Sequence, residues 1–238
     1  MATFVLVHGA WHGGWCWAPT EQRLQSMGHT VFCPTLTGQG DRSHMLVPDI
    51  TPDTHVADIV NFIRWRGLTD VILVGHSYGG MVITGVAGQI PEALHAMVYL
   101  DAFVPEESGV SLFTKAYPKR MEAFQKDIAA GALAVKADNF DVWTDMPETR
   151  ALLVEKCTDQ PVKTRLNGVT LTRREAEVAH KHFIICTRNA SSGFWPHYEK
   201  VQGRAGWSRD SIDSKHTAMV DAADALTQKL HAYADSLP

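Results

Sequence analysis

The sequence predicts an α/β fold in which a mostly parallel sheet of about six strands is covered by helices on both faces. Short, almost continuously apolar runs alternate along the chain with segments whose apolar residues recur at helical spacing. Glycine or proline stands at many of the borders between these segments. The chain has 238 residues, a length that suits one structural domain with a single core.

The apolar runs predict strands over residues 3–9, 29–35, 70–75, 96–102 and 182–187. The helical spacing predicts helices over residues 18–28, 54–67, 78–89 and 222–236. In the second of these helices, Val56, Ile59, Val60 and Ile63 fall on one face, and Gly67 follows as a stop signal. Because strands and helices alternate, neighbouring strands are expected to run parallel.

The alternation stops between residues 105 and 180, where helix-like and irregular stretches follow one another. An excursion between two strands of one sheet explains this better than a second folding unit, since the pattern resumes after it. We therefore expect a core made of residues 1–104 and 181–238, with residues 105–180 inserted as a cap within a single structural domain.

Charge and composition exclude several classes of function. The net charge is −4 and no run of Lys and Arg is longer than two, which argues against nucleic acid or membrane as a partner. The chain starts without a basic segment and its four cysteines form no C-x-x-C pair, so we expect a cytoplasmic protein with reduced thiols. None of the twelve histidines shows metal-ligand spacing, and neither a metal nor another cofactor is expected. A small-molecule substrate is the expected partner, and a homodimer stays open.

A candidate nucleophile lies in the stretch VILVGHSYGGMVITG, residues 71–85. It contains the pattern G-x-S-x-G, centred on Ser77 between Gly75 and Gly79. The bare pattern arises easily by chance, but here a buried strand precedes it and a helix follows it, as a nucleophile elbow requires. Small residues on both sides let the backbone turn sharply and expose the hydroxyl of Ser77. The alternative is a structural glycine-rich turn.

A serine needs a base to accept its proton, and in this architecture the histidine comes last in the chain. His216 stands in the stretch DSKHTAMVDAADAL, in a loop before the final helix. We predict that His216 is the base. The alternative is an ordinary solvated loop histidine.

Acyl transfer also needs two donors for the developing oxyanion. The backbone N–H of Tyr78, directly after Ser77, is one candidate. The second is expected from the loop after the first strand, HGAWHGGW, with Ala10 as the donor. Otherwise this loop is a plain glycine-rich turn.

Several motifs follow one another along the chain: FVLVHGAWHGGWCW, GHSYGGMVITGVA, VYLDAFVP, FIICT and KHTAMV. In this order they resemble the α/β-hydrolase superfamily, and within it the plant methylesterase and hydroxynitrile lyase family with its bacterial relatives. The resemblance implies an α/β-hydrolase fold and a Ser-His-acid triad. Lyases of the family carry a threonine after the first loop histidine and a lysine after the catalytic histidine. Gly9 and Thr217 occupy these places, as in the esterases.

The acid of the triad departs from the family pattern. The family acid usually follows the seventh strand, but Asn189 stands there, and an amide cannot stabilise an imidazolium by charge. Asp101 is the predicted acid, because a lone carboxylate at the end of a buried strand needs a compensating partner. The rivals are Asp210 and Asp213, a role for Glu199, or a dyad without an acid.

Aromatic side chains on the oxyanion loop, after residue 102 and in the expected cap suit an apolar pocket. We predict that Trp11, His12, Phe103 and Trp143 bind substrate; Trp15, Phe113 and Phe124 are further candidates. Together the residues predict a serine hydrolase that cleaves a small, mostly apolar carboxylic ester through an acyl-enzyme. The alternatives are a carbamate or amide hydrolase of a small aromatic compound, a hydroxynitrile lyase, and a non-catalytic receptor for a small ligand.

Overall fold

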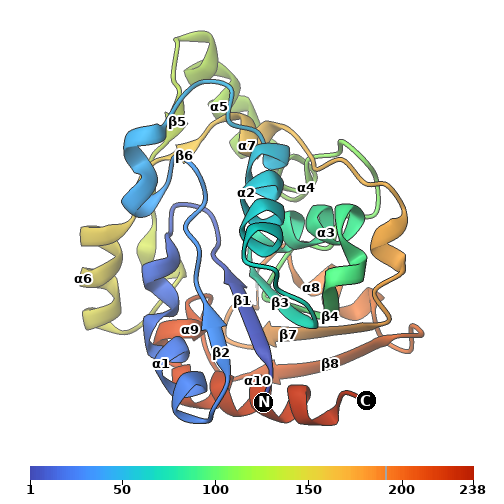
Figure 1. The fold of residues 1–238 in the computed structure, drawn as a ribbon. Helices are drawn as coiled ribbons and strands as arrows, with labels where there is room; N and C mark the ends of the chain where they lie inside the picture. Colours follow the sequence, from blue (N-terminus) through green and yellow to red (C-terminus); the bar gives the residue numbers. More distant parts are fainter. Residues whose placement is uncertain (191) are drawn as a thin grey trace.

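A computed structural model describes residues 1–190 and 192–238 and contains a six-stranded parallel sheet (Figure 1). The strands lie side by side in the order β2-β1-β3-β4-β7-β8, and each pair of neighbours is parallel. This confirms the predicted α/β class. The strands are β1 (Thr3–Val7), β2 (Thr30–Phe32), β3 (Val71–His76), β4 (Leu94–Leu100), β7 (His180–Cys186) and β8 (Trp207–Ile212).

Helices pack on both faces of this sheet. They are α1 (Ala18–Ser26), α2 (Pro52–Trp65), α3 (Gly79–Gln89), α8 (Trp195–Lys200), α9 (Ala218–Asp221) and α10 (Ala223–Ser236). Helix α2 begins where the sequence provides a strong signal, because Thr51 and Thr54 form a capping box ahead of it and Pro52 occupies its first turn. In the part of the chain that the structure describes, no helix is long and apolar enough to cross a membrane.

Alternate residues of the strands feed two separate hydrophobic clusters. Val5 and Val7 of β1 pack in the cluster that includes the apolar faces of α2 and α3. Phe4 and Leu6 pack in the other, which includes residues of α1 and α10. Because the central strands contribute apolar residues to both clusters, their sequences are continuous apolar runs rather than alternating ones.

The segment between β4 and β7 contains short elements instead of long strands. These are α4 (Leu112–Ala116), α5 (Pro118–Ala129), β5 (Ala134–Val135), α6 (Pro147–Lys156), β6 (Gln160–Pro161) and α7 (Lys163–Leu166). The strands β5 and β6 pair antiparallel, and they lie with α4, α5 and α7 in the upper part of Figure 1. The expected boundaries of the cap stay a prediction.

Strand β8 carries no clear signal in the sequence, and we predicted no strand there. Its side chains are mostly half-buried or exposed, and only Ile212 is buried. β8 forms the edge of the sheet beside β7, where the outer side of a strand is not enclosed by a neighbour. A polar edge strand therefore lacks the apolar run that identified the central strands.

Candidate active site

Ser77 stands in a strained backbone conformation at the turn from β3 into α3. Its φ is 55°, in the left-handed region that residues with a side chain rarely adopt. The surrounding chain holds it there, because the N–H of Ser77 donates to the carbonyl of Leu100 at 3.1 Å and its carbonyl accepts from the N–H of Phe103 at 3.2 Å. Backbone hydrogen bonds to the end of β4 and to the residues after it thus hold the turn in place.

Glycines make this turn sterically feasible. A Cβ on Gly75 would lie 2.6 Å from the carbonyl oxygen of Gly79, and one on Gly79 would lie 2.8 Å from that of His8. Neither position has room for a larger residue. The G-x-S-x-G pattern is therefore a packing requirement of the turn that presents Ser77.

Asp101 follows β4 directly and is fully buried, again with a left-handed φ of 41°. Its Oδ2 lies 2.6 Å from Nδ1 of His216. The same oxygen accepts a 2.7 Å hydrogen bond from the side-chain amide of Asn189, while Oδ1 accepts one of 3.3 Å from the N–H of Cys186. The carboxylate is thus satisfied on both oxygens, at the position that the sequence suggested for the acid.

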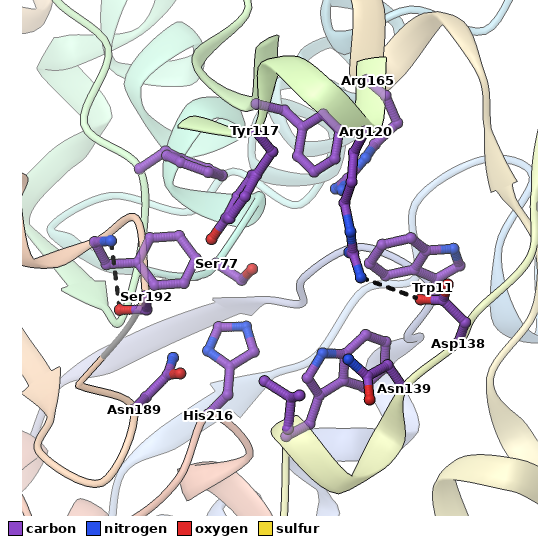
Figure 2. A pocket seen from close by; sticks show the side chains of 15 residues that line it. Trp11, Ser77, Tyr117, Arg120, Asp138, Asn139, Arg165, Asn189, Ser192 and His216 are labelled. Carbon is purple, nitrogen blue, oxygen red and sulfur yellow. Dashed lines mark hydrogen bonds and ion pairs between the residues drawn. The ribbon is translucent and has the colours of Figure 1, made fainter. Parts of the chain in front are cut away.

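The imidazole of His216 has a defined orientation. Its Nδ1 faces Asp101, so Nε2 is the nitrogen left for the pocket. The ring of Phe194 stacks on it with centroids 5.2 Å apart, and Nε2 of His76 donates to the carbonyl of His216 at 2.9 Å. Ser77 and His216 line the same pocket, and Figure 2 shows Ser77 beside the imidazole.

The rival acids lie elsewhere. Asp210 forms an ion pair with Lys229 at 2.7 Å, and Asp213 and Glu199 are exposed. Among the described residues, Asp101 is the carboxylate that contacts His216.

The two predicted oxyanion donors flank Ser77. Ala10 and Tyr78 are both buried, and within residues 1–190 and 192–238 neither backbone N–H donates to a protein acceptor. The loop of Ala10 touches the elbow, since a Cβ on Gly9 would lie 3.0 Å from Cβ of Ser77. The side chain of Tyr78 contacts His55 of α2. Nε2 of His55 must donate to the carbonyl of Thr37, so Nδ1 is the acceptor, and the hydroxyl of Tyr78 donates to it at 2.9 Å.

Two histidines brace the loop of Ala10 rather than facing the pocket. His12 was expected to bind substrate, but it is buried and does not line the pocket. Its Nδ1 donates to the carbonyl of Ala10 at 2.7 Å, and burial lowers its pKa to about 4. His8 donates from Nδ1 to the carbonyl of Gly9 at 2.8 Å and accepts at Nε2 from the N–H of Leu36; burial lowers its pKa to about 3. Both rings are neutral at pH 7.

The pocket next to Ser77 has a volume of about 280 Å³. Its aromatic side includes the expected residues Trp11, Phe103, Phe113 and Trp143, whereas Trp15 and Phe124 lie outside it. The segment between β4 and β7 contributes residues that the sequence did not single out, because no pattern marks a side chain that reaches a pocket from an irregular segment. They are Tyr117, Arg120, Asp138, Asn139, Val142 and Arg165. Asn189, Ser192 and Phe194, which follow β7, complete the lining.

The model of the alpha/beta hydrolase family matches residues 4–228 of this chain. A carbendazim hydrolyzing esterase from Nocardioides sp. (strain SG-4G) is 39% identical over 98% of this chain and 99% of that protein. Salicylic acid-binding protein 2 of Nicotiana tabacum is 34% identical over 122 residues, which are 50% of this chain and 47% of that protein.

Solved structures agree on the fold. An extracellular alpha/beta-hydrolase from a Paenibacillus species superimposes with a TM-score of 0.84 over 98% of this chain and 99% of that one, at 22% identity. A likeness at that identity concerns the fold alone. The family model and the full-length relative go further: this chain belongs to the alpha/beta hydrolase family.

Proposed function

We propose that this protein is a serine hydrolase that cleaves a small, mostly apolar carboxylic ester through an acyl-enzyme intermediate. The observation that carries the proposal is the contact between Asp101 and His216 beside a strained Ser77 at the wall of one pocket. Esterases among the full-length and partial relatives support the same reaction class.

In this mechanism the hydroxyl oxygen of Ser77 attacks the ester carbonyl while Nε2 of His216 takes its proton. The tetrahedral intermediate collapses with cleavage of the ester C–O bond, and His216 returns the proton to the leaving alcohol. Water then attacks the acyl-enzyme by the same route, which releases the acid and restores Ser77. Asp101 holds His216 in the tautomer with Nδ1 protonated and stabilises the imidazolium that forms.

The N–H groups of Ala10 and Tyr78 hold the oxyanion. Both have no protein acceptor among the described residues, so they can donate to a substrate oxygen without breaking an existing bond. One good donor of this kind lowers the barrier by about 3 to 4 kcal/mol. The neutral His12 and His8 donate to the carbonyls of Ala10 and Gly9, and these hydrogen bonds fix the backbone of the loop that supplies the donor.

A carbamate or amide is the second candidate substrate, since it would pass through the same steps. The observation that favours it is the 39% identity to a protein named a carbendazim hydrolyzing esterase. Lyase chemistry is less suited, because Gly9 and Thr217 lack the side chains that the lyases use; Thr217 instead donates its hydroxyl to the carbonyl of Trp143 at 3.0 Å.

Residues 105–180 act as the cap in this proposal, because eight of them line the pocket beside Ser77. A cap of this kind limits access of water and selects the leaving group.

A cytoplasmic location also belongs to the proposal; it is supported by four cysteines that form no disulfide within the described residues.

A labelling experiment tests the central claim. A fluorescent alkyl phosphonate should modify the native protein at Ser77, and hydrolysis of 4-nitrophenyl butyrate should fall by about 10⁵- to 10⁶-fold in Ser77→Ala. Ser26→Ala, an exposed serine on α1, is the control and should match the native protein. Turnover of every ester and carbamate at native rates by Ser77→Ala would refute the proposal, and a correctly folded native protein that resists the phosphonate would favour the receptor alternative.

A further inference from the structure

Arg165 is a buried cation in the wall of the pocket that contains Ser77 and His216. It lies on α7, and only 5% of its surface is exposed. Figure 2 shows Arg165 and His216 on opposite sides of the pocket. Charged residues are rarely buried to this extent unless a partner compensates them.

Within the described residues, the guanidinium of Arg165 has no such partner. It forms no ion pair with a carboxylate, and none of its nitrogens makes a hydrogen bond; Nε is buried with nothing to accept from it. The hydroxyl of Ser111 donates only to the backbone carbonyl of Arg165. Burial lowers the pKa of the guanidinium to about 9, so the group is still a cation at pH 7.

Two aromatic rings hold the guanidinium in place. Its central carbon lies 3.4 Å from the ring centroid of Phe113 and 4.5 Å from that of Trp11. Trp11 is itself fixed, because its indole N–H donates to the carbonyl of Val135 at 2.8 Å and its backbone N–H donates to Oε1 of Gln160 at 2.9 Å. These contacts orient the cation. Its N–H groups lie in the plane of the guanidinium, however, and the ring faces above and below that plane do not accept hydrogen bonds from them.

We infer that Arg165 binds a carboxylate of the substrate, so that the preferred esters carry a free carboxylate on an otherwise small apolar body. A planar guanidinium with unused donors matches a carboxylate in both charge and geometry. The inference rests on the proposed function, because it places the ester carbonyl at Ser77 and the carboxylate on the far side of the same pocket. The volume of about 280 Å³ restricts both groups to one small molecule.

Arg120 provides a matched comparison in the same pocket. It is also a cation, but its side chain is 48% exposed and it lies 3.9 Å from a carboxylate oxygen of Asp138. Figure 2 marks this ion pair. A water-exposed cation that already has an acid beside it gains little from a second carboxylate. Selectivity should therefore depend on Arg165 and not on Arg120.

The test compares two pairs of esters that differ in one carboxylate. The first pair is 4-nitrophenyl butyrate and mono-4-nitrophenyl succinate, and the second is phenyl butyrate and 4-carboxyphenyl butyrate. In at least one pair the native protein should favour the carboxylate ester in kcat/KM by about 10- to 100-fold, the range expected for a charge-assisted hydrogen bond. The pair that responds identifies the half of the substrate that bears the charge.

Substitutions connect the preference to Arg165. Arg165→Met keeps an unbranched apolar stem and should abolish the preference, because it should lower kcat/KM far more for the carboxylate ester than for the neutral one. Arg165→Lys keeps the charge without the planar fork and should retain a small part of the preference. Arg120→Gln should retain most of it.

Inhibition of the native protein supplies a measurement that needs no variant. Succinate should compete with 4-nitrophenyl butyrate at least ten times more strongly than butyramide does. Equal preference in Arg165→Met and the native protein, or equal losses for charged and neutral esters, would overturn the inference. Loss of all ester turnover together with failure of Ser77 to react with phosphonate would instead refute the proposed function.

Discussion

The side-chain amide of Asn189 donates a 2.7 Å hydrogen bond to the carboxylate of Asp101. The oxygen that accepts it is the one that faces Nδ1 of His216. Asn189 follows β7 and Asp101 follows β4, and these two strands are neighbours in the sheet. The amide of Asn189 therefore holds the carboxylate that we propose as the acid of the triad, which follows the adjacent strand.

Asp101→Asn should lower kcat by about 10³- to 10⁴-fold, because the amide can stabilise the wrong tautomer of His216 and carries no charge to offset an imidazolium. The measurement is kcat for 4-nitrophenyl butyrate, with circular dichroism to check folding. The control is Asp213→Asn, because Asp213 is exposed and lies in the loop that contains His216. Its rate should stay within two-fold of the native rate. A fully active Asp101→Asn protein would remove Asp101 from the mechanism.

Gly80→Ala should destabilise the protein by about 1 to 3 kcal/mol and disturb Ser77, because the new Cβ would lie 2.2 Å from the backbone oxygen of Phe103. Gly88→Ala on the same helix is the matched control. There the Cβ would meet the side-chain hydroxyl of Thr172 at 3.0 Å rather than a backbone oxygen at 2.2 Å, and alanine favours the helix by about 1 kcal/mol. Urea unfolding and phosphonate labelling of both variants measure the difference. Similar losses at both positions would contradict the packing argument.

Acid should destabilise the protein below a pH of about 6.5, because buried histidines around the oxyanion loop resist protonation. The pKa values of His12 and His55 are lowered by burial to about 4 and that of His8 to about 3, from an ordinary value of 6.5. The unfolded chain therefore binds more protons than the folded chain in this range. Each histidine contributes stability above pH 6.5 that is lost as the pH falls toward its folded pKa, by up to about 1.4 kcal/mol per pH unit.

His12→Asn isolates one of these contributions. The shorter amide can still donate to the carbonyl of Ala10 but does not titrate. The difference in unfolding free energy between native protein and variant should be constant above pH 7 and shift in favour of the variant between pH 6.5 and pH 4. Urea midpoints at pH 7.5, 6 and 5 provide the comparison. A difference that does not change with pH would show that His12 titrates alike in both states.

Trp143→Ala should widen the pocket without dismantling the loop of His216. The indole packs against Trp11 with centroids 5.3 Å apart, whereas it is the backbone carbonyl of Trp143 that accepts from Thr217 at 3.1 Å. We expect kcat/KM for 1-naphthyl butyrate to rise about 3- to 10-fold relative to methyl butyrate. Trp65→Ala is the control, because that tryptophan on α2 is 87% exposed. An unchanged ratio for Trp143→Ala would remove the ring as a limit on substrate size.

Much of the core could be predicted because its signals are local. A central strand such as β3 is buried on both faces, so its run of apolar residues is visible in the sequence alone, and the glycines beside Ser77 mark a turn that tolerates no side chain. Asp101 was identifiable for a related reason, since a lone carboxylate at the end of a buried strand requires a partner. The polar edge strand β8 carries neither kind of signal.

The sequence by itself determined the alternation of strands and helices, the elbow at Ser77 and the candidate acid and base, because each depends on the residues of one short segment. Only the tertiary structure decided that Asn189 supports Asp101, that His12 braces a loop instead of facing the pocket, and that Arg165 enters it. These outcomes depend on which distant segments the fold brings within a few ångströms of each other. Asn189 and Asp101 are 88 residues apart in the chain, and no local pattern encodes a contact across that separation.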